Sequence, residues 1–214
     1  MGHPVASSPF DAQSRVVSSN IRGFSAQRLW LDFVNGNTLA AHDVLVDFDH
    51  FVQWLESVQL LDEERAAGMR RRAVQQPGGA LAALVDARRM RSILRSLAER
   101  GSSSHDIRTE ALAEINRVLG RSAGTRRVEQ QTDGTFARAF VPVGDAFAGL
   151  LIPIVESAAD ALIRGELPRV RKCASPRCGR VFQDETKNGR RRWCDMATCG
   201  NRAKAARHRQ LTLR

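Results

Sequence analysis

The chain lacks any apolar run that approaches the roughly 18 to 20 residues needed to cross a bilayer. Its first residues, Met1-Gly2-His3-Pro4, are not a basic stretch followed by an apolar one, so no secretion signal is expected. Internal repeats are also lacking. From these absences we expect a cytoplasmic protein with no membrane partner.

Acidic residues are scarce in the last fifth of the chain. Residues 169–214 carry 14 Lys and Arg against 3 acids, a net charge of +11, whereas residues 1–168 carry 19 basic and 20 acidic residues, or −1. The whole positive excess therefore lies in this segment. Such asymmetry is typical of a basic tail that binds a polyanion on an almost neutral body. A tail that merely aids solubility is the alternative.

Cysteine is missing from the first 172 residues, and all four cysteines lie in the basic segment. In a reducing cytoplasm, clustered cysteines indicate a metal site rather than disulfides. Two Cys-x4-Cys pairs, 15 residues apart, can each supply two thiolates to one tetrahedral ion. Four thiolates leave zinc no open position for substrate, and nothing indicates the redox chemistry of iron. We expect one structural Zn²⁺, with the metal ligands Cys173, Cys178, Cys194 and Cys199.

Three regions are expected: a flexible leader over 1–24, a mostly helical domain over 25–167, and a zinc finger with a basic C-terminal helix over 168–214. The predicted fold class is mainly α with a small β-hairpin (α+β). Apolar residues at helical spacing predict the helices. They are expected from Ser25 to the stop at Asn35-Gly36-Asn37, from a cap at Asp47 or Asp49 to Val58, from Asp62 to near Pro77-Gly78-Gly79, from Ala80 to Arg100, from His105 to Leu119, and over 146–164, where Pro153 starts or kinks the helix.

The hairpin of the body is predicted from 128–131 and 135–141, which alternate around an Asp133-Gly134 turn. In the finger, 180–183 and 191–193 also alternate like two strands, with Asn188-Gly189 as the turn, and a helix is expected after the third cysteine. Knuckle, hairpin and ligand-bearing helix is the order of a treble-clef-like zinc finger with four cysteine ligands. Phe182 and Trp193 are expected in its small core, with base stacking as the alternative.

The residues around the second cysteine pair carry a resemblance. The run from Trp193 to Arg202, which contains Cys199-Gly200-Asn201-Arg202, resembles the CGNR zinc-finger family, and Gly189–Arg192 and Ala203-Lys204 fit the same pattern. Near the N-terminus, Leu31-Asp32-Phe33-Val34-Asn35 resembles the start of the ABATE domain that precedes this finger, and the segment from Phe51 to Leu55 supports that match. The family commonly has Thr after this Asn, whereas this chain has Gly36-Asn37-Thr38.

The two resemblances imply a stress-induced transcription regulator with a DNA-binding finger and a ligand-sensing or dimerising body. They imply that Trp30, Asp32 and Asn35 face a ligand pocket, although Asn35 could instead only end its helix. The expected partners are therefore DNA, a small-molecule effector and a second copy of the chain.

Seven basic residues are predicted to contact nucleic acid: Arg190, Arg191, Arg192, Arg202, Lys204, Arg207 and Arg209. On a helix, Arg202 and Arg209 share one face while Arg207 points elsewhere, so positive charge surrounds the helix. These residues would neutralise phosphates, with one or two reaching guanine edges. A solvated helix end is the alternative for these cations. Asn201 is expected to cap the helix or to tie its side chain to the loop of the finger, with base contact as the alternative.

A second metal site or an enzyme active site would need residues that the chain does not place together. The group His42, Asp43, Asp47, Asp49 and His50 matches no catalytic motif, and helix capping accounts for its acids more simply than a second metal does. A nuclease would need a histidine beside the finger, where only His208 lies, so no enzyme is expected. A finger that binds RNA or protein without sequence-specific DNA binding remains the alternative to a DNA-binding regulator.

Overall fold

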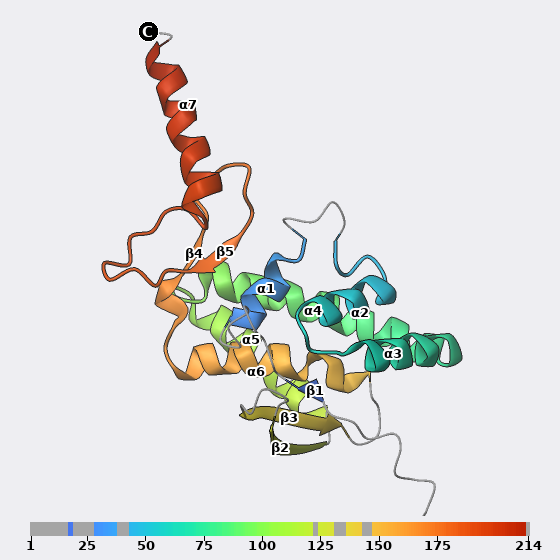
Figure 1. Ribbon diagram of the computed structural model, residues 1–214. Helices are drawn as coiled ribbons and strands as arrows, with labels where there is room; N and C mark the ends of the chain where they lie inside the picture. The colour runs from blue at the N-terminus through green and yellow to red at the C-terminus, as the bar shows by residue number, and fades with distance from the viewer. Residues whose placement is uncertain are drawn as a thin grey trace, which may run out of the picture.

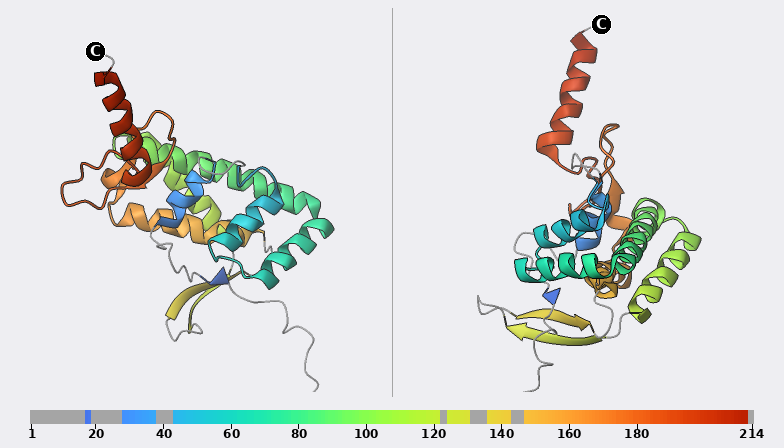
Figure 2. Two further views of the ribbon diagram at one scale, coloured as in Figure 1. Left: turned by 45° about the horizontal axis from the view of Figure 1, so that its top comes forward. Right: turned by 90° about the vertical axis from the view of Figure 1, so that its right-hand side faces the viewer.

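A computed structural model of the chain describes residues 17–18, 28–37, 43–121, 124–130, 136–142 and 147–212. A helical body carries a small β-sheet on one side and the cysteine segment on the other, and the last helix projects away from the body (Figure 1). The two views of Figure 2 show the same projection from other sides. The mainly α fold class with a small hairpin is thereby confirmed.

Six helices build the body: α1 (Leu29–Asn35), α2 (Phe48–Ser57), α3 (Glu63–Gln75), α4 (Pro77–Arg100), α5 (His105–Arg121) and α6 (Ile152–Ile163), the last preceded by the 3-10 turn η2 (Ala148–Leu151). Asp47 caps α2 by accepting a hydrogen bond from the backbone N–H of His50 at 2.8 Å, and Asp62 caps α3 in the same way. Pro153 lies at the start of α6, where its missing N–H costs nothing. None of the helices in the described part of the chain has the length and apolar composition that a bilayer crossing needs.

The Pro77-Gly78-Gly79 segment was expected to follow a helix end, but it begins α4 instead. Proline is favoured in the first helical turn, because its N–H would have no partner there. α5 likewise continues through Gly120 to Arg121. The expected helix start at Ser25 lies outside the described residues.

The small sheet has the strand order β1–β3–β2, from β1 (Val17–Ser18), β2 (Gly124–Gln130) and β3 (Phe136–Pro142). β2 and β3 pair antiparallel from Gly124 opposite Pro142 to Gln130 opposite Phe136, which confirms the predicted hairpin. Its Asp133-Gly134 turn lies outside the described residues. Val17–Ser18, inside the expected leader, pairs with β3; the rest of residues 1–24 is not described.

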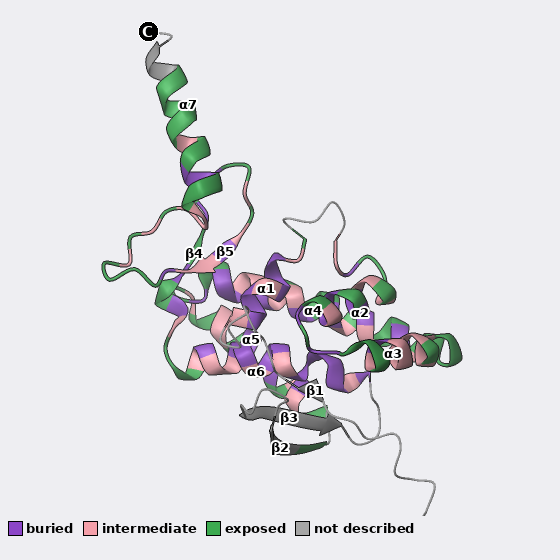
Figure 3. Ribbon diagram, in the orientation of Figure 1, coloured by how far each residue is buried: buried purple, intermediate pink, exposed green. Residues whose placement is uncertain are grey.

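The core lies where α1 packs between α4 and α6. Trp30, Phe33 and Phe51 have no exposed surface, and Phe33 packs on Trp54 with their ring centroids 5.3 Å apart. The same buried cluster runs on through Leu167, at the end of the body, to Val170 and Val181 of the finger. Figure 3 shows this buried interior, in contrast to the exposed last helix. The finger therefore shares a hydrophobic core with the body.

The hairpin of the finger differs from the predicted one. β4 (Val170–Lys172) pairs antiparallel with β5 (Val181–Gln183), whereas residues 191–193 form no strand. The first cysteine pair therefore lies inside the hairpin rather than before it. The predicted turn at Gly189 is present and takes a positive φ of 60°, but it belongs to a long loop. After this loop come the π-helical turn η4 (Met196–Gly200) and α7 (Asn201–Thr212).

Candidate zinc centre and nucleic-acid interface

The four cysteines come together at the base of α7. Their sulfur atoms all lie within 4.8 Å of one another, with 3.6 Å between Cys178 and Cys194 and 3.8 Å between Cys194 and Cys199. Thiolates at about 2.3 Å from a tetrahedral zinc ion are separated by about 3.8 Å. The four side chains therefore fit one zinc ion in a closed site. No other group of three or more metal-binding side chains occurs in the ranges that the structure describes.

The electrostatics of the thiols also favour a bound cation. Burial, together with hydrogen bonds from the other thiols, raises the pKa of Cys194, and burial raises that of Cys178. Burial also opposes the charge of Cys173, but hydrogen bonds from the backbone of Cys194 and Ser175 lower the pKa of that thiol. Four thiolates in so small a volume repel one another unless a cation compensates them. Zinc supplies this charge, so metal binding and deprotonation of the thiols are coupled.

Backbone hydrogen bonds shape the two ligand loops. The N–H of Cys173 donates to the C=O of Arg180 at 2.9 Å, and that of Cys178 donates to the C=O of Ser175 at 3.0 Å. These bonds close the turn over residues 173–180, which is called the zinc knuckle below. The N–H of Cys194 donates to the sulfur of Cys173 at 3.5 Å and so ties the second pair to the first. Such N–H···S contacts orient the ligands and stabilise the thiolate.

The turn that carries the last ligand is capped by Asp195. Its carboxylate accepts hydrogen bonds from the N–H and hydroxyl of Thr198, at 2.7 and 2.8 Å, and these bonds hold the pKa of Asp195 below its usual value. Asn201 donates from its side chain to the C=O of Ala197 at 3.1 Å, which is the structural role expected for it. A side chain in place of Gly200 would put its Cβ 2.6 Å from the sulfur of Met196 and 3.3 Å from Trp193.

Asp184 is a buried structural residue that the sequence reasoning missed. It accepts hydrogen bonds from the hydroxyl of Thr186 at 2.5 Å and from the N–H of Arg191 at 2.7 Å. Burial disfavours its charge, but these bonds and the nearby Arg171 hold the pKa of the carboxyl below its usual value. Asp184 thereby fixes the loop that leads to Cys194. The Asp-x-Thr spacing is a turn signature that could have indicated this role.

Asn35 joins the body to the finger. Its side chain donates to the C=O of Val181 at 2.8 Å and accepts from the N–H of the same residue at 2.9 Å. Val181 lies on β5, which has β4 as its one strand neighbour in the described ranges. A primary amide carries a donor and an acceptor in one plane, so Asn35 pairs with Val181 as the backbone of another strand would. Both residues are buried.

Arg95 of α4 makes a second connection at this junction. Its guanidinium donates to the C=O of Gly179 at 2.6 Å and to that of Val34 at 3.2 Å, and so links the knuckle with the C-terminal end of α1. Lys172 and Glu99 form an ion pair of 3.2 Å across the same junction. The body thus holds the zinc knuckle from two helices.

The three residues expected at a ligand pocket lie in different environments. Trp30 is fully buried in the core, and its indole N–H has no hydrogen-bond partner in the described part of the chain. The side chain of Asn35 is engaged with Val181. Asp32 is half-buried, and burial raises its pKa to about 6 against the opposing charges of Arg180 and Arg28.

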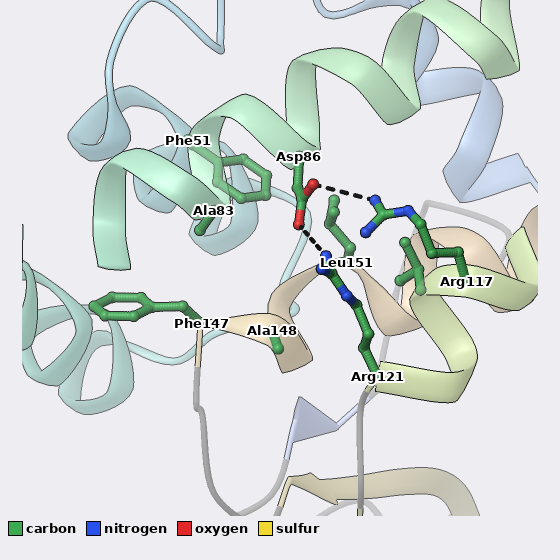
Figure 4. A pocket seen from close by; sticks show the side chains of 9 residues that line it. Phe51, Ala83, Asp86, Arg117, Arg121, Phe147, Ala148 and Leu151 are labelled. Carbon is green, nitrogen blue, oxygen red and sulfur yellow. Dashed lines mark hydrogen bonds and ion pairs between the residues drawn. The ribbon is translucent and has the colours of Figure 1, made fainter. Parts of the chain in front are cut away.

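A small cavity of about 30 Å³ lies elsewhere in the body, where α2, α4, α5 and η2 meet. Phe51, Phe147 and Leu151 contribute to its apolar walls (Figure 4). At its rim, Asp86 pairs with Arg117 at 3.1 Å and with Arg121 at 3.5 Å. The rim charges are already paired, and the volume suits a water molecule more than a larger ligand.

The seven predicted nucleic-acid residues separate into two groups. Arg191 points into the finger, where its Nε donates to the C=O of Trp193 at 2.8 Å and its guanidinium lies 5.2 Å from the ring centre of Phe182. The other six are exposed: Arg190, Arg192, Arg202, Lys204, Arg207 and Arg209. The ring of Trp193 packs under Arg192 at 5.1 Å. Phe182 and Trp193, which were expected in the core of the finger, are only half-buried. Each ring instead packs against the guanidinium of an arginine.

The acidic residues of the second candidate cluster have separate partners. Asp43 pairs with Arg91, whose hydrogen bonds lower the pKa of that carboxyl. Asp47 caps α2, and Asp49 pairs with Arg70 at 2.6 Å. His50 hydrogen-bonds to Asp47, and His42 lies outside the described residues. No metal site is formed by the described members of this group.

Comparisons with known families agree with these two parts. Residues 27–165 match the ABATE model, described as "Putative stress-induced transcription regulator", and residues 169–211 match the model of the CGNR zinc finger. The comparison with curated proteins gave no match. Since the first match spans more than half of the chain, the protein belongs to the ABATE family, and its C-terminal CGNR zinc finger binds one structural zinc ion.

Proposed function

We propose that the protein is a zinc-dependent DNA-binding transcription regulator whose finger and last helix contact duplex DNA. The observation that carries this proposal is the exposure of α7. Arg202, Lys204, Arg207 and Arg209 are all exposed, and none of them has a hydrogen-bonded or ionic partner within the described part of the chain. α7 also projects away from the body (Figure 1).

The dimensions of α7 fit a groove-binding role. Its 12 residues span about 18 Å, and a helix of this width fits the major groove of B-DNA. α7 carries charged residues all round, so it has no apolar face that would pack against the body. Its surface remains available to a partner. Arg190 and Arg192, on the loop before Cys194, add two exposed cations near the base of the same helix. Together they offer up to six phosphate contacts.

Fluorescence anisotropy of the zinc-loaded full chain on labelled duplex DNA tests the proposal. If all six cations contact phosphates, log K should fall against log salt with a slope of about −5. Arg207→Gln should make this slope shallower by about 1, whereas Arg71→Gln, an exposed arginine of α3 far from the finger, should leave it unchanged. Binding that does not respond to salt, or equal effects of the two variants, would contradict the proposal.

In this proposal the helical body senses a small molecule or dimerises and passes the change to the finger. The contacts of Asn35 and Arg95 support such coupling, because a movement of α1 or α4 reaches the knuckle through hydrogen bonds. The proposal assigns the protein no catalytic step, since four thiolates leave zinc no open position.

The junction also favours a second candidate function, in which the finger braces the body and the basic helix binds RNA or protein. Val170 and Val181 of the finger lie in the core of the body, as expected of a bracing element. Competition between duplex DNA and a structured RNA of equal length separates the two candidates. A preference for the RNA by the full chain would support the second.

A further inference from the structure

The cations of the finger divide into those that hold its fold together and those that the fold leaves free. Arg169 donates to the C=O of Thr186 at 2.8 Å, and Arg191 is hydrogen-bonded inside the finger. Arg177 and Lys187, by contrast, are exposed, and neither has a hydrogen-bonded or ionic partner within the described part of the chain. These two cations are not among the seven residues that the sequence predicts to contact nucleic acid.

Each of the two cations occupies a central position of a hydrogen-bonded turn. The zinc knuckle contains the turn 175–178, which is closed by an N–H···O=C bond of 3.0 Å between its first and last residues and has Arg177 at its third position. The loop 184–195 contains the turn 186–189, which is closed in the same way at 3.1 Å and has Lys187 at its second position. Because the backbone of both turns is already held, little backbone freedom is lost when the two side chains bind a partner.

The acidic residues of the finger do not offset these cations. Residues 169–214 contain three acids, and all three are engaged within the fold. Asp184 is buried and accepts hydrogen bonds from its own loop, and Asp195 caps η4. Glu185 forms an ion pair with Arg28 of the body. The free charges on the described surface of the finger are therefore positive, and such a surface attracts a polyanion.

The two turns lie in segments on opposite sides of the base of α7. Figure 1 and the left view of Figure 2 show the zinc knuckle on one side and the loop 184–195 on the other. The major groove of B-DNA is about 12 Å wide, close to the diameter of a helix with its side chains, about 10 to 12 Å. One phosphate strand borders each side of the groove. A helix that lies in the groove therefore has one strand next to each flanking segment.

We propose that Arg177 contacts the phosphates of one DNA strand and Lys187 those of the other, so that the two turns hold α7 in the major groove from both sides. Contacts of this kind fix the register and orientation of a protein on the duplex without reading its sequence. The inference rests on the proposed DNA-binding function. It adds two contacts to that function and assigns them to different strands.

A salt series on the zinc-loaded full chain counts the two contacts. Arg177→Gln and Lys187→Gln should each make the slope of log K against log salt shallower by about 1, and the double variant by about 2. The control Arg71→Gln should leave the slope unchanged. Both test substitutions change exposed side chains without partners in the described part of the chain, so each variant should still bind one zinc ion, as measured by atomic absorption.

Phosphate ethylation interference assigns each contact to a strand. The probe is a duplex that the wild-type chain selects from a random-sequence pool. Ethylation should weaken binding of the wild-type chain at two groups of phosphates, one on each strand across a major groove. Arg177→Gln should remove the sensitivity of one group only, and Lys187→Gln that of the other group only.

Two outcomes overturn this inference and leave the proposed function intact. In the first, the wild-type chain binds duplex DNA in a salt-dependent way but the two variants behave like Arg71→Gln. In the second, both variants remove the same group of phosphates. If the wild-type chain bound no duplex DNA, the proposed function and this inference would fail together.

Discussion

Replacing Asn35 with alanine should loosen the zinc finger from the body. The substitution removes two hydrogen bonds of 2.8 and 2.9 Å to Val181, each of which contributes about 1 kcal/mol. It also leaves the N–H and C=O of Val181, a residue that is 1% exposed, without these partners, so each lost bond costs about 1–2 kcal/mol. The expected loss of stability is therefore about 2–4 kcal/mol. Since domains of this kind are stable by about 5–15 kcal/mol, the variant should still fold.

Urea unfolding followed by tryptophan fluorescence measures this loss. Trp30 and Trp54 are buried in the body and Trp193 lies in the finger, so the signal reports both parts. With a slope of about 2 kcal/mol per molar urea, the midpoint should fall by about 1 to 2 M. Zinc release to a chromogenic chelator should accelerate in parallel, because the knuckle loses a support.

The matched control is Asn116→Ala, which changes an exposed asparagine of α5 and should alter stability by less than about 0.5 kcal/mol. If Asn35→Ala shifted the midpoint no more than this control, the inference that Asn35 joins body and finger would be wrong. A shift in the midpoint without faster zinc release would restrict the role of Asn35 to the body.

Three further results are expected. Because burial raises the pKa of Asp32 to about 6, the folded chain binds this proton more tightly than the unfolded chain, and the group lowers stability as the pH rises from about 4 through 6. Asp32→Asn should remove that loss of about 1–2 kcal/mol between thermal melts at pH 4 and at pH 7.5. If the difference between the two melts were unchanged in the variant, the carboxyl would not be buried. Cys194→Ser should abolish stoichiometric zinc binding measured by atomic absorption and unfold the finger, since metal binding and folding are coupled. Asp184→Asn should speed zinc release from the loop before Cys194 without changing the far-UV circular dichroism of the body, whereas a loss of body helicity would show that Asp184 supports more than this loop.

Capping residues and the spacing of apolar residues predicted most of the helices. Asp47, one of the two candidates, caps α2, Asp62 precedes α3 near its predicted start, and the alternating residues around 133–134 form the predicted hairpin. The predicted start of α4 was wrong, because Pro77 and the two glycines after it indicated the end of the preceding helix. Proline in a first turn and proline after a last turn look alike without knowledge of what the helix packs against.

For the site, the spacing of the four cysteines determined the metal and its closed coordination, and the acid-poor run of basic residues determined where the positive charge lies. These properties depend on residue type and short separations along the chain. The partners of β5, Asn35 and Arg191 depend on how the folded chain brings segments together. Alternation alone could not tell whether β5 pairs with the residues before it or with those after it, nor which arginine turns inward.

The sequence by itself thus determined a zinc-binding, basic C-terminal segment on a helical body. Only the tertiary structure decided that the finger is docked onto that body, because the pairing of Asn35 with Val181 joins residues that are 146 positions apart. A side chain's type fixes what it can bind, whereas the folded chain fixes which partner comes within reach.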